Sequence, residues 1–289
     1  FLISLKNRMI VATNNQLTAQ IEADFKQFLA TNYGLHIYAH QENKFKQAIC
    51  KTCQEFAGIE PDKLLKKLKT DSLCPERLLL IQHITVDESY FFRDENQHQF
   101  LRQEFLPHLI AQKRAQGDKH IRIWSAGCST GQEIYSIAIL LHQLLIDFSD
   151  WQLHLIASDI NHQSLKRAIA AEYSPWEIRS SDDLTTKAAY FTTVNAGKYQ
   201  LSDLIKKQVK FFFLNLAEDV FPSLMNQTCN LDLILCRNVF IYFQAQVIEQ
   251  TCARFSQALR PGGVLMLSAT DPMNLSSPPL IAKHSGDVF

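Results

Sequence analysis

The spacing of apolar residues predicts two regions of different secondary structure. Up to about residue 86, apolar side chains recur every three or four positions, in runs that end near glycines or begin after prolines. Such spacing is typical of amphipathic helices. From residue 121 the pattern changes to short apolar runs of strand length, separated by segments with helical spacing. This change predicts a helical N-terminal domain at residues 1–86, followed by a second domain at residues 87–289.

The second domain is expected to be α/β. The apolar runs that suit buried strands are residues 121–124, 153–157, 211–214, 231–236 and 264–267. Helical patterns lie between them, at residues 132–145, 164–172 and 244–259. Strands and helices that alternate in this way predict a Rossmann-like doubly wound sheet, whose ligands bind beyond the carboxyl ends of its strands. Residues 173–207 interrupt the alternation with a weak hairpin pattern near residues 195–198, which predicts a small inserted β-subdomain.

The composition argues against a nucleic-acid-binding, membrane-spanning or secreted protein. The chain has 29 basic and 29 acidic side chains among 289 residues, so it has no net charge that would attract nucleic acid or an anionic membrane. No apolar run approaches the roughly 20 residues needed to span a bilayer, and residues 1–11 lack the pattern of a signal peptide. We therefore expect a cytoplasmic protein with no nucleic-acid partner and no membrane insertion.

The cysteines and histidines do not predict a metal site. The seven cysteines are odd in number and scattered, unlike a disulfide framework, so a reducing compartment is favoured. Cys50 and Cys53 have the spacing of half a zinc site, but no second pair follows at ligand spacing and both lie near an apolar helical face. We expect this pair to pack in the core, and we expect no metal.

The segment after the first predicted strand contains small residues that suit a ligand-binding turn. Gly127 and Gly131 are separated by three residues, which does not match the G-x-G-x-x-G arrangement of a dinucleotide site. A cofactor crevice with free backbone N–H groups and a simple tight turn both explain the two glycines. Glu133, in the first turn of the next helix, could bind a ligand or only interact favourably with the helix dipole.

Acidic and aromatic residues mark three further positions. Asp159 ends the second strand, where a carboxylate can accept hydrogen bonds from ribose hydroxyls, although Asp159 and Asn161 would both suit an N-cap. Residues 87–94 join the two domains and combine aromatic residues with an arginine flanked by acids; a surface salt bridge beside buried rings is the alternative. Residues 236–243 follow the fourth strand, where helix capping and core packing are also possible.

Several motifs occur in one order between residues 88 and 243. They are E-S-Y-F-F-R-D (88–94), W-S-A-G-C-S-T-G-Q-E-I-Y-S (124–136), A-S-D-I (157–160), N-L (215–216) and C-R-N-V-F-I-Y-F (236–243). Together they resemble the CheR-type chemotaxis receptor methyltransferases, which transfer a methyl group from S-adenosylmethionine (SAM) to protein glutamates. Several such motifs in order are far more specific than any one of them.

The resemblance implies a SAM site, with S-adenosylhomocysteine as the product, and it implies that Arg93 and Tyr242 face the reacting centre as catalytic residues. The cofactor-binding residues that it implies are Ser89, Arg93, Gly127, Glu133, Asp159, Asn215, Leu216, Cys236, Arg237 and Asn238. Ser89 stands where the family often has threonine.

Within this set the resemblance implies separate roles. Glu133 would hold the amino-acid part of SAM and Asp159 the ribose. Asn215 and Leu216 would flank the adenine, and the residues of the fourth strand's end would border the cofactor.

The resemblance also implies a partner, the cytoplasmic helical region of chemoreceptors, methylated on glutamate carboxylates. Family members usually carry several arginines on the second N-terminal helix, whereas this chain offers lysines at positions 44, 46 and 51. A second lysine group at positions 63, 66, 67 and 69 could replace them, but a solvated helix face is the simpler interpretation. The inserted subdomain looks short, so we expect no recognition of a C-terminal receptor tether, and we expect a monomer.

A third departure from the family's pattern lies at the end of the last strand, and two other functions stay open. The last strand leads into residues 268–271, Ser-Ala-Thr-Asp, where the family usually has a Ser-Glu pair. One alternative is a SAM-dependent methyltransferase of a different protein or of a small molecule. The other is a non-catalytic signalling module that binds SAM without turnover. Base-labile methylation of receptors and a turnover assay would distinguish these functions.

Overall fold

A computed structural model describes residues 17–179, 184–194, 197–271 and 280–281. The turn of the hairpin pattern near residues 195–198 therefore lies partly outside the described residues. The chain divides into two compact units, one made of Phe1–Val86 and Tyr242–Val247, the other of Asp87–Ile241 and Ile248–Phe289. Residues 242–247 thus group with the helical unit. A single division of the chain after residue 86 leaves these residues out of that unit.

The first unit is helical, as the apolar spacing predicts. Its elements are α2 (Ala19–Tyr33), the short helix η1 (Ala39–Gln41), α3 (Glu42–Glu55), α4 (Pro61–Thr70) and α5 (Pro75–Ile84). Thr18 caps α2 by accepting a hydrogen bond from the backbone N–H of Ile21, and Gly34 ends this helix with a left-handed φ of 67°. A proline opens both α4 and α5, at the first helical position, where no N–H donor is required.

Residues 242–247 pair with the chain that follows α2. The backbone N–H of His36 donates to the carbonyl of Tyr242 at 2.8 Å, and Leu35 and Phe243 form an antiparallel bridge. A short segment distant in sequence therefore completes the helical unit through backbone hydrogen bonds.

The second unit is α/β, as predicted. Its helices are α6 (Glu95–Phe100), η2 (Leu101–Phe105), α7 (Leu106–Ala115), α8 (Gln132–Leu144), η3 (Phe148–Asp150), α9 (His162–Ala170), α10 (Leu184–Tyr190), α11 (Asp203–Lys206), η5 (Phe240–Tyr242) and α12 (Ala245–Ala258). Its strands are β1 (His120–Ala126), β2 (Gln152–Asp159), β3 (Glu172–Tyr173), β4 (Phe191–Thr193), β5 (Tyr199–Leu201), β6 (Val209–Phe213), β7 (Leu231–Leu235) and β8 (Leu259–Met266). Both η5 and α12 have residues in each of the two units.

The central sheet has five parallel strands in the order β6-β2-β1-β7-β8. The chain runs from β1 outward through β2 to β6 and then returns to β7 on the other side of β1. The strand order therefore reverses between β1 and β7, and ligands of doubly wound sheets bind at such a point, beyond the carboxyl ends of the strands. The five predicted strands and the Rossmann-like class are confirmed.

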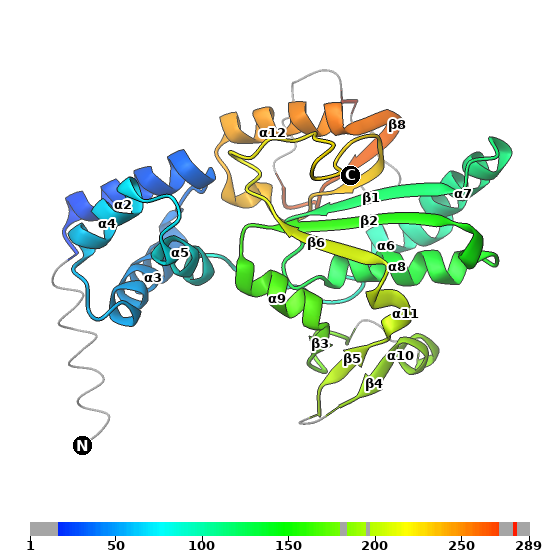
Figure 1. The fold of residues 1–289 in the computed structure, drawn as a ribbon, viewed down its shortest axis with the longest axis horizontal. Coiled ribbons are helices and arrows are strands. Elements are labelled where there is room, and N and C mark those ends of the chain that lie inside the picture. The colour runs from blue at the N-terminus through cyan, green and yellow to red at the C-terminus, as the bar shows by residue number, and fades with distance from the viewer. Residues whose placement is uncertain (1–16, 180–183, 195–196, 272–279, 282–289) are drawn as a thin grey trace. The chain divides into compact units, whose positions relative to one another are not determined.

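Helices cover both faces of this sheet, with α8 and α9 on one side and α12 on the other (Figure 1). Side chains of β1 alternate accordingly. Ile123 packs in the core that includes Ile137 of α8, whereas the Trp124 ring lies 5.3 Å from the ring of Phe255 in α12. The buried strand needs apolar residues on both faces, which is why its sequence shows a continuous apolar run rather than alternation.

The inserted region forms a separate three-stranded antiparallel sheet in the order β3-β5-β4. Leu201 and Phe191 are buried and belong to the same apolar core as Ile123 and Ile137, so the insert packs against the main sheet unit. The predicted small β-subdomain is confirmed. Across the described residues, no helix combines the length and the apolar character that crossing a bilayer requires.

Candidate functional site

The turn after β1 can be built only with glycine at two positions. Gly127 has a φ of 81°, and an added Cβ would lie 2.4 Å from Cγ2 of Val239. Gly131 has a φ of 90°, and its Cβ would lie 3.0 Å from the Cβ of Ala168. Both conformations are left-handed and both positions are crowded, so side chains are excluded here for two reasons. The turn brings main chain close to the point where the strand order reverses.

Hydrogen bonds fix this turn against the end of β2. The N–H groups of Gly127 and Cys128 donate to the carbonyl of Ser158 at 2.8 and 2.9 Å. The N–H of Ser129 donates to Oδ2 of Asp159 at 2.8 Å. Ser129 has a left-handed φ of 50°, an uncommon conformation for a serine that is often found at functional sites.

Asp159 lies at the carboxyl end of β2 and does not cap the following helix. Asn161 is the N-cap of α9, because its side chain accepts from Gln163 and Ser164 N–H groups. Asp159 Oδ1 instead accepts from the N–H of Asn161 at 2.8 Å. Burial raises the pKa of Asp159 to about 6. The carboxylate is therefore desolvated at the edge where the predicted ribose would be.

Glu133 is held by the neighbouring strand ends. Its Oε1 accepts from Ser125 Oγ of β1 at 2.6 Å, and its Oε2 lies 3.3 Å from Nη1 of Arg237. Burial raises the pKa of Glu133, and the positive charge of Arg237 opposes this shift. A favourable interaction with the dipole of α8 requires no side-chain partners, so it does not explain why Glu133 contacts Ser125 and Arg237.

Arg237 fastens residues 87–94 to this edge. It donates to the carbonyl of Arg93 at 2.8 Å, and its guanidinium lies 3.6 Å from the carboxylate of Asp94. Together with the ion pair to Glu133, one buried guanidinium connects β7, α8 and the segment that carries Arg93.

Further contacts hold the same segment along its length. The Asp87 carboxylate accepts from Ser164 Oγ at 2.6 Å, and the N–H of Phe92 donates to Ser136 Oγ at 3.0 Å. Phe92 and Asp94 both have left-handed φ values, 54° and 71°. The surface salt bridge considered from the sequence is therefore not the main role of these residues.

No carboxylate oxygen among the described residues lies within 4.0 Å of the Arg93 side-chain nitrogens, although burial raises the pKa of Glu133 and the positive charge of Arg93 acts to lower it. The Nη1 atom of Arg93 donates to the carbonyl of Glu88 at 3.1 Å. Ser89 lies beside this interaction and is partly exposed. A guanidinium whose only recorded hydrogen bond is to a backbone carbonyl can still bind an incoming carboxylate.

The end of β7 is tied to the end of β8 by a carboxylate that the sequence did not single out. Asp271 Oδ2 accepts from the N–H groups of Asn238 and Ser268, at 2.8 and 2.9 Å. The Asn238 amide donates to Ser268 Oγ and to Thr270 Oγ1. Asp271 thus joins the ends of the two strands through its carboxylate, and its position a few residues after the last apolar run was the available signal in the sequence.

Cys236, Asn215 and Leu216 have mainly structural contacts. Cys236 is fully buried and burial raises the pKa of its thiol well above the ordinary value, so it is a neutral side chain. Asn215 follows β6 and its Oδ1 accepts from the N–H of Ala217 at 3.1 Å. Leu216 is buried. The N–H of Leu214 donates to the carbonyl of Asp159 at 3.2 Å, which places this turn next to the end of β2.

Tyr242 is grouped with a different unit from the other predicted residues. It belongs to the helical unit, whereas Arg93 and all the predicted cofactor-binding residues belong to the sheet unit. The structure therefore brings together Arg93, Gly127, Glu133, Asp159, Arg237 and Asn238 along one edge, through the contacts described above.

Three buried polar atoms at this edge have no hydrogen-bond partner among the described residues: Ser129 Oγ, Arg237 Nε and Asp271 Oδ1. Buried polar atoms are nearly always satisfied in proteins, so a group of unsatisfied ones indicates a place where a polar ligand fits. The glycine turn, the desolvated carboxylates and these atoms suit the hydroxyl, amino and carboxylate groups of SAM.

A family model described as "CheR methyltransferase, SAM binding domain" matches residues 87–287. The chain belongs to the CheR methyltransferase family. It is 28% identical over 247 residues to a chemotaxis protein methyltransferase of Listeria innocua, a match that covers 86% of this chain and 88% of that protein.

Two further relatives carry similar names. Chemotaxis protein methyltransferase 1 of Pseudomonas aeruginosa is 28% identical, with 86% of this chain and 89% of the relative covered. Chemotaxis protein methyltransferase 2 of Vibrio cholerae is 32% identical over 195 residues, with 68% of this chain and 65% of the relative covered. The CheR-family chain is thus a methyltransferase that uses SAM.

Proposed function

We propose that this CheR-family methyltransferase transfers the methyl group of SAM to glutamate side-chain carboxylates of chemoreceptors, forming methyl esters and S-adenosylhomocysteine. The names of the relatives support a chemotaxis role. The chemistry of the acceptor is supported by Arg93, a guanidinium at the ligand edge with no carboxylate within 4.0 Å among the described residues. We also propose that the reaction takes place in the cytoplasm, on the helical region of the receptor.

We assign the cofactor contacts by the chemistry of each side chain. Asp159 would accept hydrogen bonds from the ribose hydroxyls, and Glu133 would accept from the amino group. Asn215 and Leu216 would flank the adenine. The remaining contacts would come from residues that border the same edge: Ser89, Arg93, Gly127, Cys236, Arg237 and Asn238.

The reaction needs alignment more than proton transfer. A glutamate carboxylate has a pKa of about 4.3 and is ionised at neutral pH, so no general base is required. SAM supplies an electrophilic methyl group on a sulfonium. Orientation of the reacting groups can contribute roughly 7–11 kcal/mol in well-oriented systems. Arg93 can hold one carboxylate oxygen while leaving the other to attack, and Tyr242 would orient the acceptor through its hydroxyl and ring.

One observation carries this proposal: the buried Arg237 guanidinium, which holds the backbone of Arg93 and the carboxylate of Glu133 at once. Because the Arg93 backbone is already held, binding of the acceptor does not lose conformational entropy by ordering it. Arg93 is therefore positioned for the acceptor by the same side chain that borders the cofactor.

Methylation of receptor-containing membranes tests the proposal. Purified enzyme and SAM labelled in the methyl group should give base-labile label on the receptor, because carboxyl methyl esters hydrolyse in base. Replacement of the labelled glutamates by alanine should remove the label, whereas aspartate-to-alanine replacements at neighbouring positions should not. Base-stable label, or label on a small molecule only, would overturn the assignment of the acceptor.

A further inference from the structure

A cluster of aromatic rings and cations adjoins the segment that carries Arg93. The central carbon of the Arg179 guanidinium lies 3.6 Å from the ring centres of both Tyr90 and Trp176. The guanidinium of Arg93 lies 6.0 Å from the same Tyr90 ring. Tyr90 therefore has two cations beside it, and it lies within the E-S-Y-F-F-R-D motif. We name Tyr90, Trp176 and Arg179 the ring–arginine cluster.

The loop that carries Trp176 and Arg179 is fixed from both sides. The carbonyl of Glu177 accepts from the N–H of Phe91 at 2.8 Å. The Glu177 carboxylate accepts from Gln132 Nε2 at 2.9 Å, and Ile178 is 1% exposed. The loop is thus attached both to the segment of Arg93 and to the first turn of α8, and the cluster needs little ordering before it binds a partner.

The cluster is accessible and its positive charge is not neutralised within the described chain. Trp176 is 47% exposed, and the hydrogen bond of Arg179 goes to the Trp176 carbonyl at 2.7 Å. Among the described residues no carboxylate lies within 4.0 Å of the Arg179 or Arg93 side-chain nitrogens. Nearby Arg167, in contrast, pairs with Glu177 at 3.2 Å.

The lysines of the helical unit offer a weaker cationic surface. Lys46 pairs with Glu22 at 2.8 Å and Lys63 with Glu60 at 2.7 Å. Lys44 donates to the carbonyl of Thr85 at 2.8 Å, and Lys67 pairs with Glu76. Three of the seven lysines considered for receptor docking, Lys46, Lys63 and Lys67, are therefore already paired with a carboxylate.

We propose that the ring–arginine cluster receives the acidic polypeptide segment around the acceptor glutamate and sets the specificity for anionic acceptors. Rigid tryptophan, tyrosine and arginine side chains are the residue types that dominate the energy of protein interfaces. A guanidinium with no carboxylate within 4.0 Å among the described residues favours an acidic partner. Arg179 acts as a positioning residue, since it holds neighbours of the acceptor and not the reacting carboxylate. This inference rests on the proposed function.

Steady-state kinetics on receptor-containing membranes test the proposal. In Arg179→Ala, the KM for receptor should rise roughly fivefold to thirtyfold, while kcat and the Kd for SAM stay within about twofold of wild type. The KM should also depend less on salt concentration, because one screened charge is lost. Arg179→Lys should fall between the two, since it keeps the charge and loses the planar stack on the rings.

Trp176→Ala should raise the KM for receptor without changing its salt dependence, because it removes apolar area and no charge. Arg102→Ala is the matched control, because Arg102 is an exposed arginine of the same unit, in η2. This variant should change neither the KM for receptor nor its salt dependence. Wild-type KM and salt dependence in Arg179→Ala would overturn the inference and leave the proposed function standing. Loss of SAM binding in that variant would also overturn it, whereas absence of receptor methyl esters with wild-type enzyme would refute the proposed function itself.

Discussion

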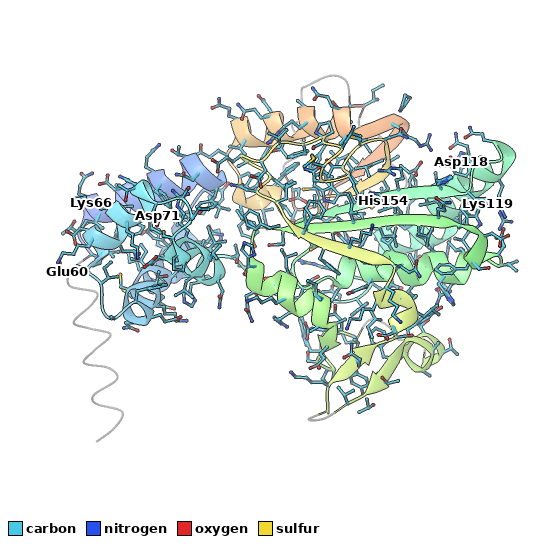
Figure 2. The ribbon with its side chains drawn as sticks, in the orientation of Figure 1. Glu60, Lys66, Asp71, Asp118, Lys119 and His154 are labelled. Atoms are coloured by element: carbon cyan, nitrogen blue, oxygen red, sulfur yellow. The ribbon has the colours of Figure 1, made fainter. Side chains whose placement is uncertain are left out.

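The two edges of the central sheet differ in how their charged groups are partnered. At the amino edge Asp118 pairs with Lys113 at 2.8 Å, and Lys119 pairs with Asp147 and Asp150 at 3.2 and 3.0 Å. Asp118 and Lys119 lie beside the start of β1 (Figure 2). At the carboxyl edge Glu133 and Asp159 are half-buried, and three buried polar atoms, Ser129 Oγ, Arg237 Nε and Asp271 Oδ1, have no hydrogen-bond partner in the described residues.

The pKa values at the two edges shift in opposite directions. The hydrogen bond from Lys113 lowers the pKa of Asp118 to about 2, whereas burial raises the pKa of Asp159 to about 6. The charge of the first carboxylate is stabilised by the fold. The charge of the second is destabilised and needs a further hydrogen-bond donor. Perturbation of this second kind is typical of functional sites, because the missing donor can come from a ligand.

The largest expected difference between the edges concerns their arginines. Arg237→Met leaves Glu133 buried beside an apolar side chain and should lower the free energy of unfolding by about 3–5 kcal/mol. Arg114→Met breaks the ion pair with Asp147, in which the Arg114 side chain is 45% exposed, and should lower it by less than about 1 kcal/mol. Denaturant unfolding at pH 7 measures both. Equal losses would contradict the contrast between the edges.

Two left-handed glycines give the next comparison. Gly127→Ala meets Val239 at 2.4 Å, whereas Gly117→Ala, before β1, meets nothing within 4 Å. Both substitutions should lower the free energy of unfolding by about 1–2 kcal/mol, because alanine is strained in the left-handed conformation. Only Gly127→Ala should also weaken SAM binding, by about tenfold or more, because its turn must shift by tenths of an ångström. Calorimetric titration with SAM checks this, and equal Kd values for the two variants would show that the turn does not approach the cofactor.

The pH dependence of SAM binding sharpens the comparison further. Hydroxyl groups that donate to Asp159 favour its ionised form, so the pKa of about 6 in the free protein should fall when SAM binds. The Kd for SAM should then be constant above pH 6 and rise up to about tenfold per pH unit below it. In Asp159→Asn this dependence should disappear. A wild-type Kd that is flat between pH 7 and 5 would remove Asp159 from the ribose contact.

The same Asp159 shift has an opposite consequence for the unliganded fold. Between about pH 4, where the unfolded carboxyl titrates, and pH 6, the folded state binds the proton more tightly. The free energy of unfolding contributed by this group should therefore decrease as pH rises through this window and level off above it. Asp159→Asn should lose this slope in unfolding experiments without ligand. A wild-type slope that persists in the variant would assign the effect to another group.

The smallest expected effect is at Asp118. Its lowered pKa contributes stability that is present above about pH 4 and is lost as pH falls through about 2. Because the Asp118 side chain is 36% exposed, solvent screens the interaction and Asp118→Asn should cost less than about 1 kcal/mol at pH 7. The Kd for SAM should not change. A loss of SAM affinity would show that the amino edge also influences the site.

The existence of the five strands and the position of the ligand edge at their carboxyl ends could be predicted from the sequence, because both follow from local patterns. Each buried strand is a short apolar run, and Asp159 and Cys236 lie at or near the carboxyl ends of two of these runs. The glycine turn was detectable in the same way, although only the contact between Gly127 and Val239 distinguishes a crowded site from a simple turn.

Interactions between distant residues could not be predicted. The contact of Arg237 with the backbone of Arg93 spans 144 positions, and no periodicity encodes it. The role of Asp271 depends on where the end of β8 meets Asn238. Residues 242–247 group with the helical unit through a backbone pairing with Leu35, a contact that side-chain patterns do not reveal.

We propose that the carboxyl edge binds SAM while the Arg93 side chain binds the acceptor carboxylate. Arg93→Ala and the control Arg102→Ala should be compared in two assays, calorimetric titration with SAM and formation of base-labile methyl ester on receptor membranes. We predict that Arg93→Ala binds SAM within about an order of magnitude of wild type and loses methyl transfer by about a hundredfold or more, because the acceptor is no longer aligned. Wild-type transfer in Arg93→Ala would contradict the account.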